Sequence, residues 1–429
     1  MRCGMCEAGQ VTTKHKLDAG GQLRHSAMCL LAAGDMDSRR VAEDAASAGR
    51  WRDLFDLCET WKVLSALEMR IVALGIVLRP AERAELSRST QPAFVQSMLC
   101  LRAGATALSV LHQAGIECAG FKGIAALAYV YAGPRHRTLQ DVDVLIHRRD
   151  VELSLEVLQR AGFTRSPDVP WNEYVAFLRN SPGTAGNEAV SLRDERGGAV
   201  DLHWHLGALE VETLLAGASM VDVLQRPLPL MSASHSMLLS VHHALRNDFV
   251  PGDIARDVCD FPHWQALLAK RGEWDKLSED AERWGLSAAC AALAGIVAGL
   301  RGEPDSEPPL PVSPEDQAAA KQLAAFYFHQ LFTGAINTDL AYVASTRPAR
   351  QVLAGLTCGW KEYRNLMRQS EQVNGEESLS VPHRLWRLGK SVAGLSSAEW
   401  KQVRALARAK GKVADQQLPS VSNETGPKE

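Results

Sequence analysis

The sequence lacks an apolar run long enough to cross a bilayer. Its most apolar window is LSAACAALAGIVAGL, residues 286–300, which falls short of the ~20 residues that a membrane-spanning helix needs. The first residues, MRCGMCEAGQVTTKHK, also lack the apolar segment of a secretory signal. These absences predict a protein with no membrane partner.

An excess of charge of either sign is also missing, because 47 Lys and Arg residues balance 50 Asp and Glu residues. A chain so balanced is not a general binder of polyanions. The one basic stretch, residues 383–412, contains Trp386 and Trp400 and a single acidic residue, Glu399. It is either a weak RNA or lipid patch or an amphipathic helix with a solvated basic face, and we favour the helix.

The nine cysteines show no framework of paired spacings. An odd number of scattered cysteines, most of them in apolar helical contexts, is typical of reduced thiols. Cys3 and Cys6 form one CxxC without the second pair that a zinc site requires. The cysteine pattern therefore predicts a cytoplasmic protein.

Several catalytic motifs are absent as well: no GxxxxGK[ST], HExxH, GxSxG or GxGxxG is present. Hydrophobic patterning instead predicts an α+β fold, in which a small mixed sheet with helices is flanked by helical segments. The predicted strands are 116–121, 141–146, 188–192 and 200–204, and the main predicted helices are 60–76, 91–114, 124–131, 234–247, 254–270, 276–300, 314–332 and 349–368.

These elements divide the chain into six predicted parts. They are a loose leader (1–35), an N-terminal helical segment (36–95), an α/β core (96–230), an all-helical region (231–370), a basic helical segment (371–413) and a disordered tail (414–429).

Asp141 and Asp143 stand two residues apart in the sequence DVDVLI, which alternates polar and apolar residues. On a half-buried strand both carboxylates point to the same face and repel each other unless a cation lies between them. Oxygen ligands suit Mg²⁺ or Mn²⁺. The two residues could equally cap a turn at the start of the strand.

Asp201 favours the metal interpretation. It lies in the middle of another predicted strand, between Val200 and Leu202, where a charge is costly without a partner. If this strand pairs beside the strand of Asp143, three carboxylates converge. Three carboxylates that bridge two metal ions suit in-line attack on phosphorus.

Lys122 and Gly123 lie where a predicted strand turns into a helix. Backbone N–H groups at such a turn favour an anion, and glycine lets a phosphate approach the backbone closely. Lys122 would add a point charge, and Arg137 could grip phosphate oxygens in a bidentate fork. A tight turn with exposed basic residues is the alternative.

Histidines offer further candidates. His203 and His205 alternate with Asp201 and would share its face, where we expect them to orient a metal-bound carboxylate or the substrate; the alternative is an ordinary hydrogen-bonded histidine of the sheet. His242, His243, Asp257 and Asp260 resemble the residues of a metal-dependent phosphohydrolase, but the His-Asp dipeptide that such enzymes use is absent.

The run FKGIAALAYVYAGPRHRTLQDVDVLIHRRD, then a helix ending in AGF, then VDLHWHL, resembles a family of uncharacterised bacterial nucleotidyltransferases. That family belongs to the DNA polymerase β-like superfamily. It carries a Lys-Gly turn, an Arg before Asp-x-Asp, and a later Asp-Leu-His-Trp strand. The likeness covers residues 100–210 and is fainter in the helical region. Most of the superfamily has Gly-Ser at the phosphate turn, where this chain has Lys122-Gly123.

The resemblance implies an Mg²⁺-dependent (or Mn²⁺-dependent) nucleotidyltransferase that moves a nucleoside monophosphate from an NTP to an acceptor hydroxyl and releases pyrophosphate. Its implied metal-binding catalytic residues are Asp141, Asp143 and Asp201, and its implied nucleotide-binding residues are Lys122, Gly123 and Arg137. The acceptor stays open between a small molecule, a peptide, a protein and an RNA end. The alternative is a module of the same fold that binds a nucleotide without catalysis.

Overall fold

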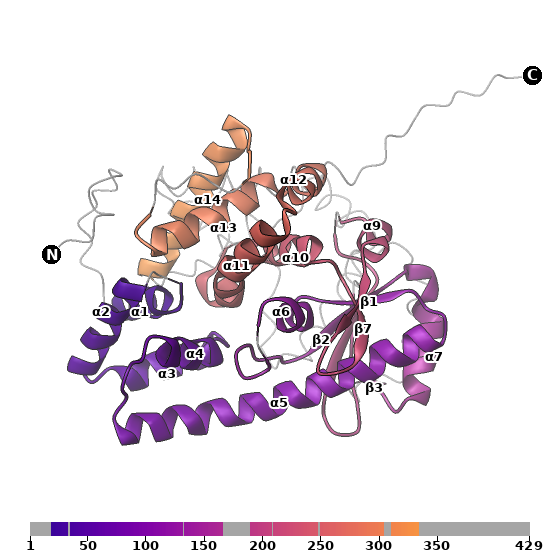
Figure 1. Ribbon diagram of the computed structural model, residues 1–429, viewed down its shortest axis with the longest axis horizontal. Helices are drawn as coiled ribbons and strands as arrows, with labels where there is room; N and C mark the ends of the chain where they lie inside the picture. The colour runs from indigo at the N-terminus through magenta and orange to yellow at the C-terminus, as the bar shows by residue number, and fades with distance from the viewer. Residues whose placement is uncertain are drawn as a thin grey trace, which may run out of the picture.

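The structure is a computed structural model that describes residues 19–32, 35–131, 133–165, 189–207, 209–247, 249–303 and 310–333. Within these residues, seven strands form one mixed sheet in the order β3-β4-β5-β2-β1-β7-β6. Figure 1 shows how the helices lie around the sheet. The strands are β1 (Cys118–Phe121), β2 (Val142–Ile146), β3 (Thr164–Arg165), β4 (Ala189–Arg193), β5 (Ala199–His203), β6 (Ser219–Asp222) and β7 (Pro227–Leu230). The predicted α+β fold is confirmed.

Strand β2 lies at the centre of the sheet, antiparallel to β1 and parallel to β5. All five of its residues are buried, so the prediction of a half-buried strand over 141–146 is wrong. The strand is covered on both faces, and it begins at Val142 rather than at Asp141. A charged side chain on this strand is therefore removed from water and needs partners.

Helix α5 (Pro80–Gln113) is the longest helix of the described residues and packs against β1, β2 and β5. Gly104 permits this close approach, because a Cβ atom there would lie 2.6 Å from the Val142 side chain. The sequence analysis found no run that could cross a bilayer, but by length and composition alone α5 could do so. Half of the most apolar window of α5 is buried inside the protein. The helix also runs across the domain boundary predicted at residue 96.

The N-terminal helices are α1 (Ala19–Ala32), α2 (Asp35–Ser47), α3 (Trp51–Thr60) and α4 (Leu64–Ala73). Helix α1 corrects the prediction of a loose leader for residues 19–32, whereas residues 1–18 lie outside the described residues. Its apolar residues Met28, Cys29 and Leu30 are buried, and it packs against α14 (Pro314–Thr333), nearly 300 residues away in the chain. Local periodicity could not reveal a helix whose burial depends on so distant a partner.

Between β1 and β6 lie α6 (Gly123–Tyr129), the 3-10 turn η2 (Arg148–Asp150), α7 (Val151–Arg160) and α9 (Val211–Ala216). Strands β6 and β7 were not predicted. The sequence PLPL of β7 has a proline at every second position, which argues against a strand, yet β7 lies between β1 and β6 in the sheet.

The helical region contains α10 (Ala233–Arg246), α11 (Pro251–Arg271), α12 (Trp274–Arg283), α13 (Ser287–Leu300) and α14. The single helix predicted over 276–300 is in fact two helices, because Gly285 adopts a φ of 65° and turns the chain between α12 and α13. The helix predicted at 349–368, the segment 371–413 and the tail 414–429 lie outside the described residues.

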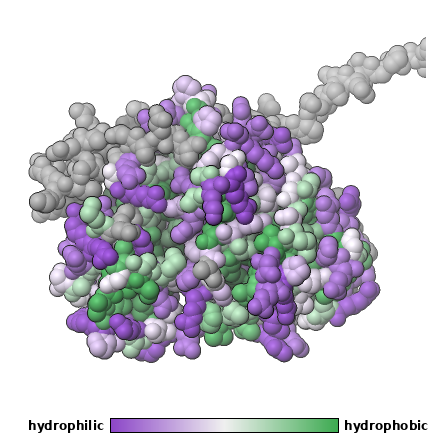
Figure 2. All heavy atoms as spheres, viewed as in Figure 1, coloured by the Kyte–Doolittle hydropathy of each residue, from purple (hydrophilic) through white to green (hydrophobic). Residues whose placement is uncertain are grey.

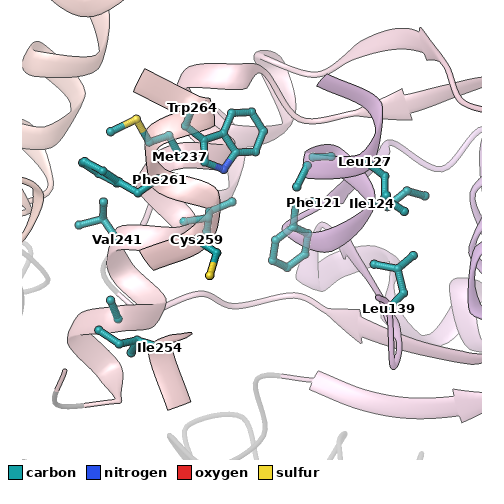
Figure 3. Packing of buried hydrophobic residues seen from close by; sticks show 14 of the residues in the cluster. Phe121, Ile124, Leu127, Leu139, Met237, Val241, Ile254, Cys259, Phe261 and Trp264 are labelled. Carbon is teal, nitrogen blue, oxygen red and sulfur yellow. The ribbon is translucent and has the colours of Figure 1, made fainter. Parts of the chain in front are cut away.

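The helical region packs against β1 and α6 at one side of the sheet. Figure 3 shows Phe121, Ile124 and Leu127 on one side, and residues of α10 and α11 such as Phe261 and Trp264 on the other, all within one buried cluster. On the surface, Figure 2 shows hydrophilic residues interspersed with apolar ones over the face in view. The α10–α11 pair is thus placed beside the turn that follows β1.

Candidate active site

The candidate site starts from a row of residues across the sheet. Asp143 on β2 pairs with Asp201 on β5, Asp201 pairs with Ser191 on β4, and Asp143 pairs with Phe121 on β1. Residues directly opposite each other on neighbouring strands project from the same face. The sheet therefore brings Asp143 and Asp201 side by side, which meets the condition that the sequence analysis set for Asp201.

Asp143 is the most enclosed acid of this row, with 9% of its side chain exposed. Its Oδ1 accepts a hydrogen bond from Lys122 Nζ at 2.7 Å and one from His203 Nε2 at 3.0 Å. Burial would raise the pKa of Asp143, but the Lys122 charge and the His203 contact outweigh it and hold that pKa below its usual range. Since the carboxylate is ionised, His203 carries its proton on Nε2 and donates it.

Lys122 turns toward Asp143 rather than toward solvent. Burial lowers the pKa of Lys122, but the charge and hydrogen bond of Asp143 prevail and raise it above its ordinary value. The side chain therefore stays an ammonium. The sequence predicted that Lys122 would bind a phosphate. In the structure its ammonium group instead binds Asp143, a candidate metal ligand.

Gly123 follows Lys122 and begins α6. A Cβ atom at this position would lie 2.5 Å from Leu139 Cδ2 and 3.6 Å from Arg137 Nη1. Any larger residue at this position, serine included, meets the Leu139 side chain. A larger residue at this turn therefore requires the buried Leu139 side chain to move.

We expect Gly123→Ala to destabilise the protein by about 1–3 kcal/mol, the usual cost of overpacking a buried site. Urea unfolding of the single variant, of Leu139→Ala and of the double variant would measure this effect. The double variant should recover part of the loss, because Leu139→Ala removes the clashing methyl groups. If Gly123→Ala lowers the free energy of unfolding equally in the wild-type and the Leu139→Ala backgrounds, the steric explanation is wrong.

Asp141 precedes β2 and is half-buried. Burial, together with the charges of Asp143 and Asp201, raises the pKa of Asp141 above its ordinary value. The three predicted carboxylates are thus close enough to repel one another.

Three of these side chains have the spacing and the ligand atoms that a divalent cation needs. Each of Asp143, Asp201 and His203 offers one ligand atom, and these atoms lie within 4.8 Å of one another. Two carboxylates and an imidazole suit Mg²⁺ or Mn²⁺, with the nitrogen better tolerated by Mn²⁺. Asp141 is not part of this group, although the sequence predicted it as a ligand.

Ser191 is a site residue that the sequence analysis missed. Its hydroxyl donates to Asp201 Oδ1 at 2.6 Å, so it fixes one oxygen of that carboxylate. An isolated serine on a predicted strand carries no signal of such a role, which depends on the β4–β5 register.

Arg137 does not reach toward solvent as a phosphate clamp would. Its Nε lies 3.0 Å from Asp260 Oδ2 on α11, and its Nη1 donates to the Thr138 carbonyl at 2.9 Å. The Tyr131 hydroxyl donates to Asp260 Oδ1 at 2.6 Å. This buried triad of Arg137, Asp260 and Tyr131 ties the loop before Asp141 to the helical region.

His205 lies beyond β5, which ends at His203, so the alternation of a strand does not place it on the face of Asp201. His205 is exposed, and its Nδ1 accepts a hydrogen bond from the Gly207 backbone. The structure thus shows a contact between His203 and the Asp143 carboxylate, and the role of His205 stays a prediction.

The phosphohydrolase interpretation also finds no support in the described part of the chain. His243 Nδ1 lies 2.7 Å from Asp257 Oδ2, while Asp260 is engaged by Arg137. Among the described residues, these side chains do not form a group with metal-ligand spacing.

Comparison with known proteins agrees with this geometry. Residues 47–302, more than half of the chain, match the family described as "Uncharacterised nucleotidyltransferase". The matched range contains the strand pair β2–β5, the Lys122-Gly123 turn and helices α10 to α13. A search of curated proteins finds no match. The chain thus belongs to this uncharacterised nucleotidyltransferase family.

Proposed function

We propose that the protein is a metal-dependent nucleotidyltransferase of the DNA polymerase β-like kind, which transfers a nucleoside monophosphate from an NTP to an acceptor hydroxyl. The observation that carries this proposal is the pairing of Asp143 with Asp201 on parallel strands, next to the Lys122-Gly123 turn. The metal is Mg²⁺ or Mn²⁺, held by Asp143 and Asp201, with Asp141 nearby.

When bound, the ion supplies Lewis acidity to the reacting oxygens. Asp201 takes the proton of the acceptor hydroxyl through the oxygen that Ser191 does not occupy. The acceptor oxygen forms a bond to the α-phosphorus, the bond from that phosphorus to the bridging oxygen breaks, and pyrophosphate leaves with the electron pair.

Other residues hold the reactants. His203 orients Asp143, and Lys122 and Gly123 face the triphosphate. Arg137 acts as a positioning residue for the nucleotide, since its Nη1 lies beside the Gly123 turn while Asp260 holds its Nε. Within the described residues, all six cysteines are buried and none forms a disulfide, which supports the proposed cytoplasmic location.

The test is label transfer. The protein is incubated with each NTP labelled at the α-phosphate, with Mg²⁺ or Mn²⁺, and with cell extract as a source of acceptors. We expect one NTP to label a discrete acceptor in a metal-dependent manner, with matching release of pyrophosphate.

The alternative is a nucleotide-binding module of the same fold that has no activity. It predicts saturable binding of NTP and Mn²⁺ without pyrophosphate release under any of these conditions. Lys122-Gly123, in place of the superfamily's Gly-Ser, is the feature that favours this alternative.

A further inference from the structure

We propose that the Lys122 ammonium serves as a built-in cation beside Asp143, so that the site binds one divalent ion rather than two. The inference rests on the proposed function for its catalytic meaning. Its evidence is the geometry around Asp143, which differs from that of an open pair of metal-bridging carboxylates.

The backbone of Lys122 is the first observation. Its φ is 52°, a conformation that glycine adopts readily and a lysine rarely does. Such strain costs about 1–3 kcal/mol and persists where the surrounding structure imposes it. Here it carries the side chain back over the end of β1, where Nζ meets Asp143 Oδ1 at 2.7 Å and lies 5.3 Å from the centre of the Phe121 ring.

The hydrogen-bond capacity of Asp143 is the second observation. A carboxylate oxygen has two lone pairs, and on Oδ1 Lys122 and His203 take both. Oδ2 is then left for a metal ion. A second ion on Oδ1 would have to displace the ammonium and the imidazole together.

The arrangement of the other acids agrees with a single ion. Asp201 stands beside Asp143 within the group that has metal-ligand spacing, whereas Asp141 is outside it. A single ion would bind to Asp143 Oδ2 and to Asp201, the two carboxylates that face each other across the β2–β5 pair.

The lysine can also do what a second ion does for the nucleotide. An ammonium group has three N–H donors, and among the described residues the hydrogen-bond partner of Lys122 Nζ is Asp143. Two donors are left for triphosphate oxygens. Lys122 would thus bridge Asp143 and a phosphate, as a divalent ion bridges them in a two-ion site.

The test counts the ions. Electron paramagnetic resonance measures Mn²⁺ bound per chain in the complex with an NTP analogue whose α,β-bridging oxygen is replaced by methylene. We expect one Mn²⁺ in the wild type and two in Lys122→Gly. Glycine suits the φ of 52°, so this variant removes the ammonium without straining the turn, and circular dichroism would verify its folding.

Lys62→Gly is the matched control. Lys62 is also a lysine with positive φ, 60°, but it is exposed and follows α3. We expect it to bind one Mn²⁺, like the wild type.

Two ions in the wild-type complex, or one ion in folded Lys122→Gly, would overturn the inference while leaving the proposed function intact. Absence of both nucleotide and Mn²⁺ binding in the wild type would overturn the inference and the proposed function together. Because the ions are counted without turnover, slow catalysis does not affect the result.

Discussion

Asp143→Asn is expected to lower pyrophosphate release by about 1,000-fold or more, because stabilisation of the transition state by a bound metal ion amounts to several kcal/mol. The change keeps the shape of the side chain but removes the charge that joins Lys122, His203 and the metal. Release of pyrophosphate is measured with an NTP labelled at the γ-phosphate, at saturating Mn²⁺. The control Glu195→Gln, in the exposed turn between β4 and β5, should keep wild-type activity.

The thermal stability of Asp143→Asn shows whether repulsion among the carboxylates or the ion pair with Lys122 dominates at the site. Relief of the repulsion among Asp141, Asp143 and Asp201 would stabilise Asp143→Asn, whereas loss of the counter-ion of Lys122 would destabilise it. We expect destabilisation, since the contacts of Asp143 hold its pKa below the usual range despite burial. A melting temperature above that of the wild type, measured without metal, would show instead that carboxylate repulsion dominates.

Asp260→Asn is expected to lower the free energy of unfolding by about 3–5 kcal/mol, the usual cost of removing one partner of a buried ion pair. Asp260 is 1% exposed and Arg137 is 9% exposed, so the guanidinium would be left without a counter-ion where water cannot replace it. Urea unfolding measures the loss. Glu279→Gln, an exposed change on α12, should stay within about 0.5 kcal/mol of the wild type.

A paired substitution separates charge from packing. Replacement of both partners, Arg137→Met with Asp260→Leu, should recover much of the loss, because apolar residues of similar volume often replace a buried ion pair at little cost. The Tyr131 hydroxyl would lose its acceptor and limit the recovery. A loss below about 1 kcal/mol in Asp260→Asn would mean that the pair is not the link between the loop and α11.

Local sequence patterns determined the elements that carry the site. Strands β1, β2, β4 and β5 lie within one or two residues of their predicted positions, because short apolar runs between turn residues fix strands locally. The Lys122-Gly123 turn and the beginning of α6 were predicted for the same reason. The range that matches the family, residues 47–302, contains these local motifs.

Only the tertiary structure decided which residues meet. That Asp143 lies beside Asp201 depends on the β2–β5 register, which the sequence offered only as a condition. The partner of Arg137 is Asp260, 123 residues away, and the burial of α1 depends on α14. No periodicity encodes such pairs, because their energy appears only when distant segments have packed.

The engagement of Lys122 shows the same limit at the centre of the site. The sequence identified a lysine at a turn that suits phosphate, but the positive φ of Lys122 and the burial of Asp143 direct its ammonium to a carboxylate. A charge on a strand that is covered on both faces must find a partner within the protein. The chemistry of the residues was readable in the sequence, whereas their pairing followed from the enclosure of β2.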